Sequence, residues 1–293
     1  MSPGRYSMGK IVWLASYPKS GNTWIRVLLT NYLRNSNTPA DINRLDGGPI
    51  ASARIWFDEW AGLEASSLND EVIERLRPDV YRCMASEASD TLYMKVHDAW
   101  SITDRSEALF PSDVTAGMIY ILRNPLDMAA SCAHHWGVAV ERAVENMCDA
   151  EFVSSRSLGG LSDQLRQRLL SWSGHVQSWL DESGLPVNVV RYEDLRRDPE
   201  EAFGKVVRYC SLPYDETRLR KAVAFSDFSE LQRQEKEKGF RERSVRAPGP
   251  FFRRGQIGAW REELPVDLVK RLVEAHGAMM KRFGYLDGNN EPV

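Results

Sequence analysis

Apolar residues recur along this chain with two different periods, and each period predicts a local structure. Short runs with strand character cover residues 11–14, 91–97, 118–122 and 187–190. Apolar positions at helical spacing predict helices at residues 24–33, from 126 onward, and at 200–210, 217–224 and 266–283. A short helix at 70–77 should end at Pro78, and a longer helix should cover about 162–182. Strands that alternate with helices predict an α/β fold, with a central, mostly parallel sheet and helices on both faces.

The composition is typical of an ordinary globular protein. The 293 residues are 43% hydrophobic and 27% charged, which is enough for a single large domain over residues 1–293. A formal net charge of −3 argues against a nucleic-acid binder held by a general basic field. The N-terminus is short and polar, and Pro18 and Lys19 break the apolar run after it, which fits neither a signal peptide nor a membrane span. We therefore expect a cytoplasmic protein without a membrane or nucleic-acid partner.

Cysteine and acidic residues do not indicate a metal site. Cys83, Cys132, Cys148 and Cys210 lie far apart without C-x-x-C spacing, which favours reduced thiols over a disulfide frame or a zinc site. No acidic strand end of the Walker-B type is present to hold Mg²⁺. We therefore expect no metal cofactor.

The stretch from residue 11 to residue 33 predicts a strand, a sharp turn and a helix. A loop that opens a helix exposes unpaired backbone N–H groups at the positive end of the helix dipole, which is a natural cradle for phosphate or sulfate. Lys19, Ser20 and Thr23 add a cation and two hydroxyls there. In the nucleotide-binding pattern G-x-x-x-x-G-K-[ST], Gly21 and Thr23 match, but Asn22 occupies the lysine position and the cation lies at Lys19 instead. The alternative is a plain strand-turn-helix with a solvated lysine.

Two further predicted strands end in polar residues of the same kind. Lys95 and His97 lie on the same side of their strand, because strand side chains repeat every two residues. Arg123 closes the next strand, with Asn124 and Pro125 forming the turn into a helix. Ligands of open α/β sheets bind outside the carboxyl ends of the strands, so His97 is well placed for a ligand site, although a lone histidine at a strand end is more often structural. Arg123 could instead form an ion pair with Asp127.

The loop at residues 17–24 resembles the motif Y-P-K-[SA]-G-x-x-W of the sulfotransferases that depend on 3′-phosphoadenosine-5′-phosphosulfate (PAPS). The resemblance implies a P-loop-like loop that binds the 5′-phosphosulfate through Lys19, Ser20, Gly21, Asn22, Thr23 and Trp24. His97 and Lys95 match the K-x-H element of that family, in which the histidine is the catalytic base and the lysine positions the reacting groups. Further landmarks follow in family order, so the resemblance covers nearly the whole chain.

These landmarks concern the nucleotide. Arg123 and Ser131 match the R-x₇-S pair that holds the 3′-phosphate, and the R-R-G element adds Arg253, Arg254 and Gly255. Tyr192 matches the tyrosine that packs near adenine and ribose, and Ser226 and Phe228 match a short element at the adenine end. The chain departs from the family pattern at Arg254, which replaces a lysine, and at Ala259, which replaces an aspartate.

The resemblance implies transfer of the PAPS sulfuryl group to a hydroxyl, less readily to an amine, of a small-molecule acceptor, with release of adenosine 3′,5′-bisphosphate (PAP). His97 would take the acceptor proton, Lys19 would stabilise the charge on the transferring group, and Lys95 would position both partners. The alternatives are a small-molecule kinase of the P-loop type and a nucleotide-binding protein without catalysis. Aromatic residues at 56–60 and Trp100 favour a phenolic or bulky apolar acceptor, while Asp58 and Glu59 leave a cationic acceptor open.

Three segments are expected to be flexible loops, at about 35–69, 137–160 and 229–250. The aromatic residues at 56–60 in the first could line a substrate pocket or form a satellite core. The second, with Gly159 and Gly160, is expected to be a lid or an acceptor-side insertion. The third is dense in charge and is expected to be a mobile loop that can close over the nucleotide. The tail at 287–293 should fray.

Overall fold

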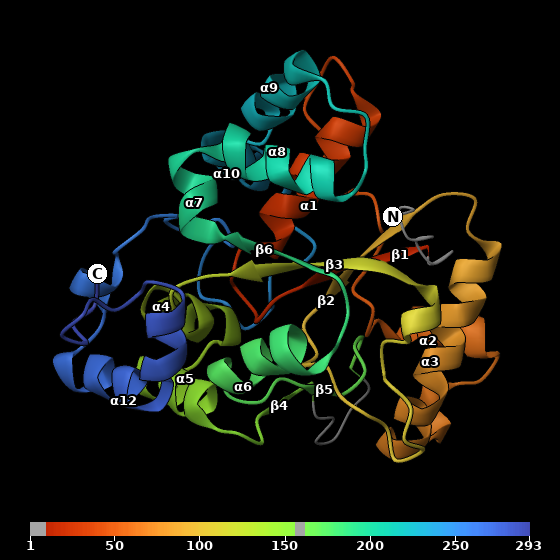
Figure 1. Ribbon diagram of the computed structural model, residues 1–293, viewed down its shortest axis with the longest axis horizontal. Helices are drawn as coiled ribbons and strands as arrows, with labels where there is room; N and C mark the ends of the chain where they lie inside the picture. The colour runs from red at the N-terminus through yellow and green to blue at the C-terminus, as the bar shows by residue number, and fades with distance from the viewer. Residues whose placement is uncertain (1–9, 156–161) are drawn as a thin grey trace, which may run out of the picture.

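The central sheet of the computed structural model contains four parallel strands in the order β2-β1-β3-β6. The model describes residues 10–155 and 162–293. Each predicted strand is present, as β1 (Ile11–Ala15), β2 (Leu92–Val96), β3 (Thr115–Leu122) and β6 (Val187–Arg191). The predicted α/β fold with a parallel sheet between helices is therefore confirmed (Figure 1).

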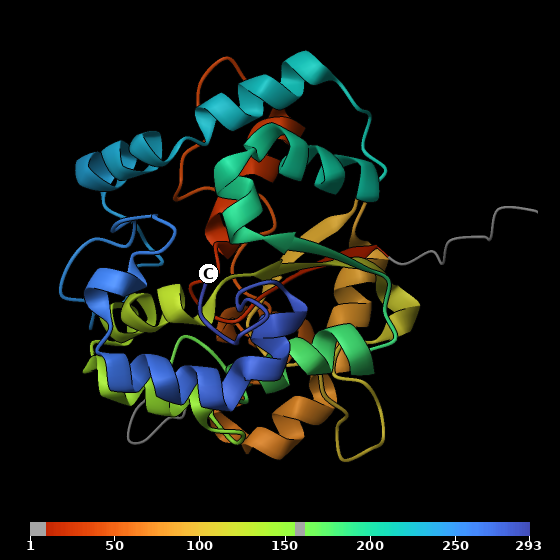
Figure 2. The ribbon, with the colours of Figure 1, turned by 60° about the vertical axis from the view of Figure 1, so that its left-hand side comes forward.

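Side chains of the central strands alternate between two buried faces. In β1, Trp13 packs into one apolar cluster, and Val12 and Leu14 pack into the other. Figures 1 and 2 show a helical layer over each face. One layer contains α3 (Asp70–Glu87), α4 (Pro125–Trp136), α5 (Val140–Cys148), α6 (Trp172–Gln177) and α12 (Val266–Arg282). The other contains α1 (Asn22–Arg34), α7 (Tyr192–Arg197), α8 (Pro199–Tyr209), α9 (Glu216–Phe225) and α10 (Phe228–Lys238). Burial on both faces explains why β1 and β3 are almost continuously apolar, whereas β6 at the edge of the sheet exposes Val187 and Val189.

Helix α3 does not end at Pro78, so that prediction is wrong. The helix begins after Asn69, which caps the Val72 amide, and it continues through the proline to Glu87. A proline inside a helix removes one backbone hydrogen bond. The apolar face nevertheless continues beyond it, because Tyr81 and Met84 are buried in the same cluster as residues on the first half of the helix. Packing of this face against the sheet outweighs the loss.

The helix expected over residues 162–182 begins only at Trp172, where Ser171 caps it through the Gly174 amide. A π-helical turn at Ser178–Glu182 then extends it. Before it, the backbone pairs with other segments: the Leu165 amide donates to Ser52 O, and β5 (Gln167–Arg168) pairs with β4 (Val153–Ser154). These tertiary pairings replace the helical hydrogen bonds that the sequence pattern favoured.

The three expected loops contain helices. α2 (Arg54–Ala61) lies in the first, α5 in the second and α10 in the third. Phe57 of α2 belongs to the core, and the tryptophans at 56 and 60 pack against that core, which favours the satellite-core alternative for these aromatics. Gly159 and Gly160 lie outside the described residues. The tail turns back, with the Val293 amide donating to Tyr285 O, so the expectation that it frays is wrong.

Candidate active site

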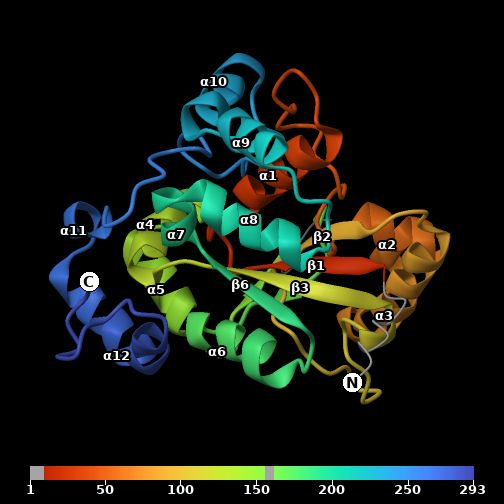
Figure 3. The same ribbon diagram turned by 45° about the horizontal axis from the view of Figure 1, so that its top comes forward.

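The carboxyl ends of the four parallel strands meet at one edge of the sheet (Figure 3). The loop at 16–21 follows β1, His97 follows β2, Arg123 follows β3 and Tyr192 follows β6. The predicted site residues that lie at strand ends are therefore brought to one edge, where open α/β sheets bind ligands.

The loop after β1 has the backbone shape of an anion cradle. Lys19 and Gly21 both lie in the left-handed region, with φ of 71° and 105°. A Cβ atom at Gly21 would lie 2.8 Å from Cδ2 of Tyr192, so glycine is needed here for space as well as for its backbone angle. Gly21 caps α1 without a side chain, which leaves the first amides of the helix without a side-chain acceptor. These amides can bind a phosphate or sulfate oxygen.

Several side chains of this loop hold the loop itself together. Ser20 Oγ donates to Tyr17 O over 2.9 Å, and Asn22 Nδ2 donates to Leu14 O over 2.7 Å. Trp24 Nε1 donates to the backbone oxygen of Ser226 over 2.8 Å, which ties the start of α1 to the end of α9. Thr23 is buried in the same first turn. The backbone amides and the Lys19 ammonium are therefore the donors that this loop offers to an anion, with the Thr23 hydroxyl in the same turn.

The Lys19 ammonium lies 3.3 Å from the centroid of the Phe251 ring. Burial, together with the cations of Lys95 and Arg123, lowers the pKa of Lys19 to about 7. A bound anion would compensate for both effects. The fraction of Lys19 that is protonated therefore depends on whether an anion is bound.

His97 has the geometry of a general base. Its Nδ1 lies 2.8 Å from the backbone oxygen of Ser16, which can only accept, so Nδ1 carries the hydrogen and Nε2 carries the free lone pair. Burial, and then the Lys95 ammonium, hold the pKa of His97 well below its usual range. The imidazole is consequently neutral near pH 7 and can take a proton at Nε2.

Lys95 is paired with a residue that the sequence did not point to. Its Nζ donates to Glu242 Oε2 over 2.8 Å, and Glu242 also binds the buried guanidinium of Arg26. Glu242 belongs to the segment at 239–252, which follows α10. This segment therefore contacts both Lys95 and, through Phe251, Lys19.

Arg123 is buried between the loop after β1 and the backbone at Gln256. Its Nη1 donates to Lys19 O over 3.1 Å and its Nη2 to Gln256 O over 3.3 Å, while the guanidinium lies 4.3 Å over the Tyr192 ring. Its Nε is buried without an acceptor. A buried donor of this kind is costly unless a ligand satisfies it, and a phosphate oxygen would do so. Ser131 lies half-buried on α4, two turns along the helix that follows.

Asp127 does not serve as an ion-pair partner of Arg123. Its two carboxylate oxygens instead accept from the amides of Gly258 and Trp260, over 2.8 and 3.0 Å. The alternative reading of Arg123 as half of an Arg123–Asp127 pair is therefore wrong. Asp127 fixes the backbone just after the R-R-G element, at the point where Ala259 replaces the family aspartate.

The two arginines of the R-R-G element already have carboxylate partners. Arg253 Nη2 donates to Glu263 Oε2 over 2.8 Å, and Arg254 Nη2 donates to Glu262 Oε2 over 2.7 Å. Arg254 also reaches Glu263 through Nη1. Gly255 follows with φ of 62°, and a Cβ there would lie 2.6 Å from the Phe228 ring. The basic pair is present where predicted, and a phosphate that binds it would have to displace or share these carboxylates.

Trp24 of the 17–24 motif lies near Phe228 of the element that the resemblance places at the adenine end. Trp24 and Phe228 both face the Arg196 guanidinium, whose central carbon is 5.6 and 5.8 Å from the two ring centroids. Ser226 is fully buried, and its hydroxyl donates to Ala222 O and accepts from Asn31 Nδ2. These two hydrogen bonds hold the end of α9 to α1. A contact between the Ser226 hydroxyl and the nucleotide remains a prediction.

Sequence reasoning missed the acidic residues that hold site segments in place. Glu235 accepts from the amides of Phe251 and Phe252 over 2.6 and 2.9 Å. Glu193 accepts from the Asn124 amide over 2.9 Å, which joins the ends of β6 and β3. Because their partners are backbone amides far along the chain, no local pattern could identify these carboxylates.

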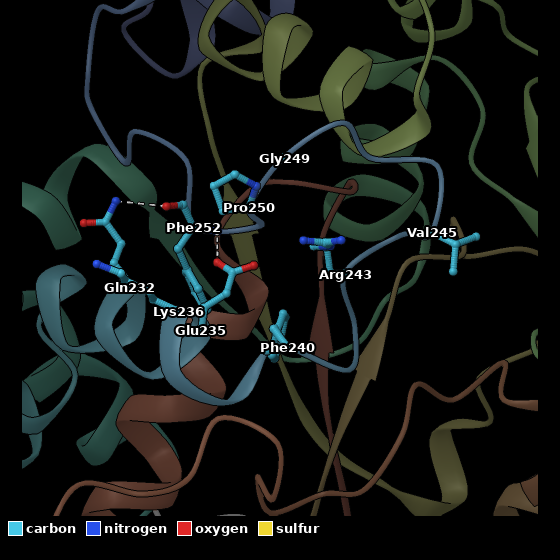
Figure 4. Close-up of a pocket in the computed structure, with 10 residues that line it drawn as sticks. Gln232, Glu235, Lys236, Phe240, Arg243, Val245, Gly249, Pro250 and Phe252 are labelled. Atoms are coloured by element: carbon cyan, nitrogen blue, oxygen red, sulfur yellow. Dashed lines mark hydrogen bonds between the residues drawn. The ribbon is translucent and has the colours of Figure 1, made fainter.

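A cavity of about 710 Å³ lies between α10 and the 239–252 segment (Figure 4). Its lining is mixed, with apolar Phe240, Pro250 and Phe252 beside cationic Lys236 and Arg243. None of the described catalytic candidates lines it. The cavity thus adjoins the site only through the segment that carries Glu242 and Phe251.

No metal or membrane element is found in the described part of the chain. Among residues 10–155 and 162–293, no three His, Cys, Asp or Glu side chains are grouped to hold a metal ion. No helix within those ranges is long and apolar enough to cross a membrane. All four cysteines are free thiols.

Known proteins resemble the chain over nearly its full length. Sulfotransferase 1C2 from Rattus norvegicus is 24% identical over 280 residues, which cover 91% of this chain and 82% of the relative. Cytosolic sulfotransferase 12 from Arabidopsis thaliana is 22% identical over 274 residues, which cover 88% of this chain and 74% of the relative.

Solved structures share the fold. Retinol dehydratase in complex with androsterone and the inactive cofactor PAP matches with a TM-score of 0.59 at 18% identity, covering 95% of this chain and 82% of that one. Mouse sulfotransferase SULT7A1 complexed with PAP matches with a TM-score of 0.56 at 17% identity, covering 92% and 84%.

A match to a protein family decides among the three functions that the sequence left open. It favours sulfuryl transfer over a kinase and over a nucleotide-binding protein without catalysis. Residues 10–284 match the sulfotransferase domain, and the protein belongs to that family.

Proposed function

We propose that the protein transfers the sulfuryl group of PAPS to a hydroxyl of a small-molecule acceptor and releases PAP. The observation that carries this proposal is the pairing of His97 with the loop after β1. Ser16 O accepts a hydrogen bond from His97 Nδ1 over 2.8 Å, which leaves the lone pair on Nε2 and ties the base to the loop that forms the anion cradle. A base and an anion site joined in this way suit transfer between a bound anion and a hydroxyl.

The residues that we propose bind the nucleotide come from three parts of the chain. The amides after Gly21 would bind the 5′ end, and Trp24 and Phe228 would take the adenine. The 3′-phosphate would bind the cationic side chains at Arg123, Arg253 and Arg254, with Ser131 as a further donor. PAPS supplies a sulfuryl group that is activated by its bond to the 5′-phosphate. The buried, unsatisfied Nε of Arg123 supports an anion at this end.

The proposed roles of the reacting residues follow from their protonation. His97 is neutral because burial and Lys95 depress its pKa, so Nε2 takes the proton of the acceptor hydroxyl. Lys19 and the loop amides stabilise negative charge on the side of the departing nucleotide. Lys95 would position the reacting groups, and Glu242 holds its ammonium in place.

We propose a phenolic or bulky apolar acceptor and a cytoplasmic location. The first rests on the aromatic surroundings of the site, which include Phe251 beside Lys19 and His135 beside Phe251. It also agrees with the androsterone bound by the retinol dehydratase of similar fold. The location rests on the cytosolic relative from Arabidopsis thaliana.

The test compares His97→Ala with Lys19→Ala in the presence of PAPS. Loss of the base should leave PAP affinity nearly unchanged while turnover falls about 10²- to 10⁴-fold. A nitrophenol, whose hydroxyl is already acidic, should lose less turnover than an alkyl alcohol. Lys19→Ala should slow both acceptors comparably and should also weaken nucleotide binding.

The matched control is His134→Ala, which removes a histidine that binds Pro250 O over 3.1 Å from α4. It should retain most of the turnover. Labelled ATP in place of PAPS should give no transfer. Full turnover by His97→Ala with the natural acceptor would remove His97 as the base and leave His135 as the residue to test next.

A further inference from the structure

We infer that His175 is a positioning residue that holds the backbone of the catalytic base, a role that rests on the proposed function of His97. His175 lies on α6 and is fully buried. It comes from no element that the sequence linked to the reaction. Its two ring nitrogens nevertheless bind two elements of the site edge.

The hydrogen bonds of His175 define one tautomer. Its Nε2 lies 3.0 Å from the backbone oxygen of His97, and its Nδ1 lies 2.7 Å from the hydroxyl of Tyr120 in β3. Because a carbonyl oxygen can only accept, Nε2 carries the hydrogen and Nδ1 accepts from the tyrosine. A chain of two directed hydrogen bonds therefore runs from Tyr120 through His175 to the backbone of His97.

These two hydrogen bonds persist at physiological pH. Burial lowers the pKa of His175 to about 4, so the ring is neutral and Nδ1 remains free to accept. Burial also raises the pKa of Tyr120 well above its usual range, so its hydroxyl keeps the hydrogen that it donates. Neither partner changes its role between about pH 5 and pH 9.

Neighbouring residues of the same helical segment hold the backbone that follows the base. Trp179 Nε1 donates to Asp98 O over 2.9 Å, and Ser178 Oγ accepts from the Trp100 amide over 3.1 Å. Positions 175, 178 and 179 lie on one helix face, because helical side chains repeat at three and four residues. This face thus binds three backbone groups between residues 97 and 100, and His175 is the member that reaches His97 itself.

His175 also contacts the anion loop. The Tyr17 ring packs edge-on against the imidazole, with 5.5 Å between the ring centroids. Tyr17 is adjacent to Ser16, whose backbone oxygen receives the Nδ1 hydrogen of His97. His175 therefore contacts His97 directly and also contacts Tyr17, whose neighbour Ser16 binds His97. These contacts fix the distance between the base and the loop.

The imidazole satisfies two groups at once, the backbone oxygen of His97 and the buried hydroxyl of Tyr120, and leucine would leave both without this partner. One of these two groups belongs to the proposed base. A general base loses rate steeply when it is displaced by about 1 Å. The directed bond to His97 O supplies that control of position.

The experiment compares His175→Leu with His175→Gln in the full-length protein. Leucine removes the donor, whereas the glutamine amide can present an N–H close to the position of Nε2. His175→Leu should lower kcat about 10- to 100-fold for an alkyl alcohol acceptor, with less loss for a nitrophenol and with PAP affinity nearly unchanged. His175→Gln should recover most of the kcat. Residual activity that falls equally for both acceptors, or unchanged kcat in His175→Leu, would overturn the inference.

A second measurement holds even where the leucine variant does not fold. Nitrogen NMR of the unmodified protein should find the hydrogen of His175 on Nε2, and Tyr120→Phe should shift that signal and lower kcat several-fold. A hydrogen on Nδ1 would overturn the inference. Failure of the proposed function is distinguishable, because His97→Ala would then keep its turnover. Turnover that is lost in His97→Ala and kept in His175→Leu contradicts only the role of His175.

Discussion

Nucleotide binding should take up a proton at Lys19. In the free protein, burial and the nearby cations of Lys95 and Arg123 together lower the pKa of this lysine to about 7. A phosphate or phosphosulfate group in the loop after β1 supplies the opposite charge, which favours the ammonium form. The pKa of Lys19 should therefore return toward the ordinary lysine value of about 10.4 when PAP binds.

The size of the uptake follows from these two values. At pH 8, a group with a pKa of about 7 is roughly 9% protonated, so binding should take up about 0.9 proton per nucleotide. The phosphates of PAP are fully ionised at pH 8, because their second pKa is about 6, so they do not contribute. The uptake should decline as the pH is lowered toward 7, where about half of the lysine is already charged.

Isothermal titration calorimetry measures this uptake directly. PAP is titrated into the protein at pH 8 in Bicine and in Tris, whose ionisation enthalpies differ and which bring no phosphate into the cell. The slope of the observed binding enthalpy against the ionisation enthalpy of the buffer gives the number of protons. Lys19→Arg is the matched control, because a guanidinium stays charged and can still bind the anion. It should bind PAP with a slope near zero.

A slope near zero for the unmodified protein would refute this reasoning, since Lys19 would then be charged before the ligand arrives. An equal slope in Lys19→Arg would assign the proton to another group. The second result would contradict the role of burial at Lys19 even if PAP bound tightly.

Three further outcomes test the nucleotide site. AMP should bind more than tenfold more weakly than PAP, because it lacks the 3′-phosphate and each lost charge-assisted contact costs roughly 1.5 to 3 kcal/mol; equal affinities would remove the 3′-phosphate site. Glu263→Gln should tighten PAP binding about two- to fivefold, because the arginines at 253–254 then bind the phosphate without first breaking an ion pair with this carboxylate. Weaker binding would mean that Glu263 orients the two arginines instead. Gly21→Ala should lower the free energy of unfolding by about 1–3 kcal/mol, because of its φ of 105° and the contact with Tyr192, and an unchanged melting temperature would contradict that strain.

The sequence was sufficient for the parts of the structure that depend on local pattern. The strands β1 and β3 are apolar on both faces, the edge strands β2 and β6 are mostly apolar in sequence, and the turn at residues 16–21 contains Pro18 and Gly21. The site residues at strand ends followed, because parallel strands bring their carboxyl ends to one edge.

The remainder depends on contacts between distant segments. Pro78 reads as a helix end, yet the buried face beyond it maintains α3. Residues before Trp172 have a helical pattern, yet their amides bind Ser52 O and the β4 strand. The carboxylates of Glu235 and Glu242 read as surface charge in a polar stretch, and only the folded chain reveals their amide, lysine and arginine partners.

The position of β2 at the edge of the sheet has a consequence for how this enzyme can diversify. The outer side of β2 is covered by the stretch before α2, where the Ala51 amide donates to Lys95 O over 2.8 Å. The strands that lead to the nucleotide contacts, β1, β3 and β6, lie on the other side of β2. Replacement of residues 47–61 would thus alter the surroundings of the base strand directly, and it would reach α1 through Gly48 O, which accepts from Arg26 Nη2 over 2.9 Å. An exchange limited to residues 49–61 would therefore act on the base side of the site.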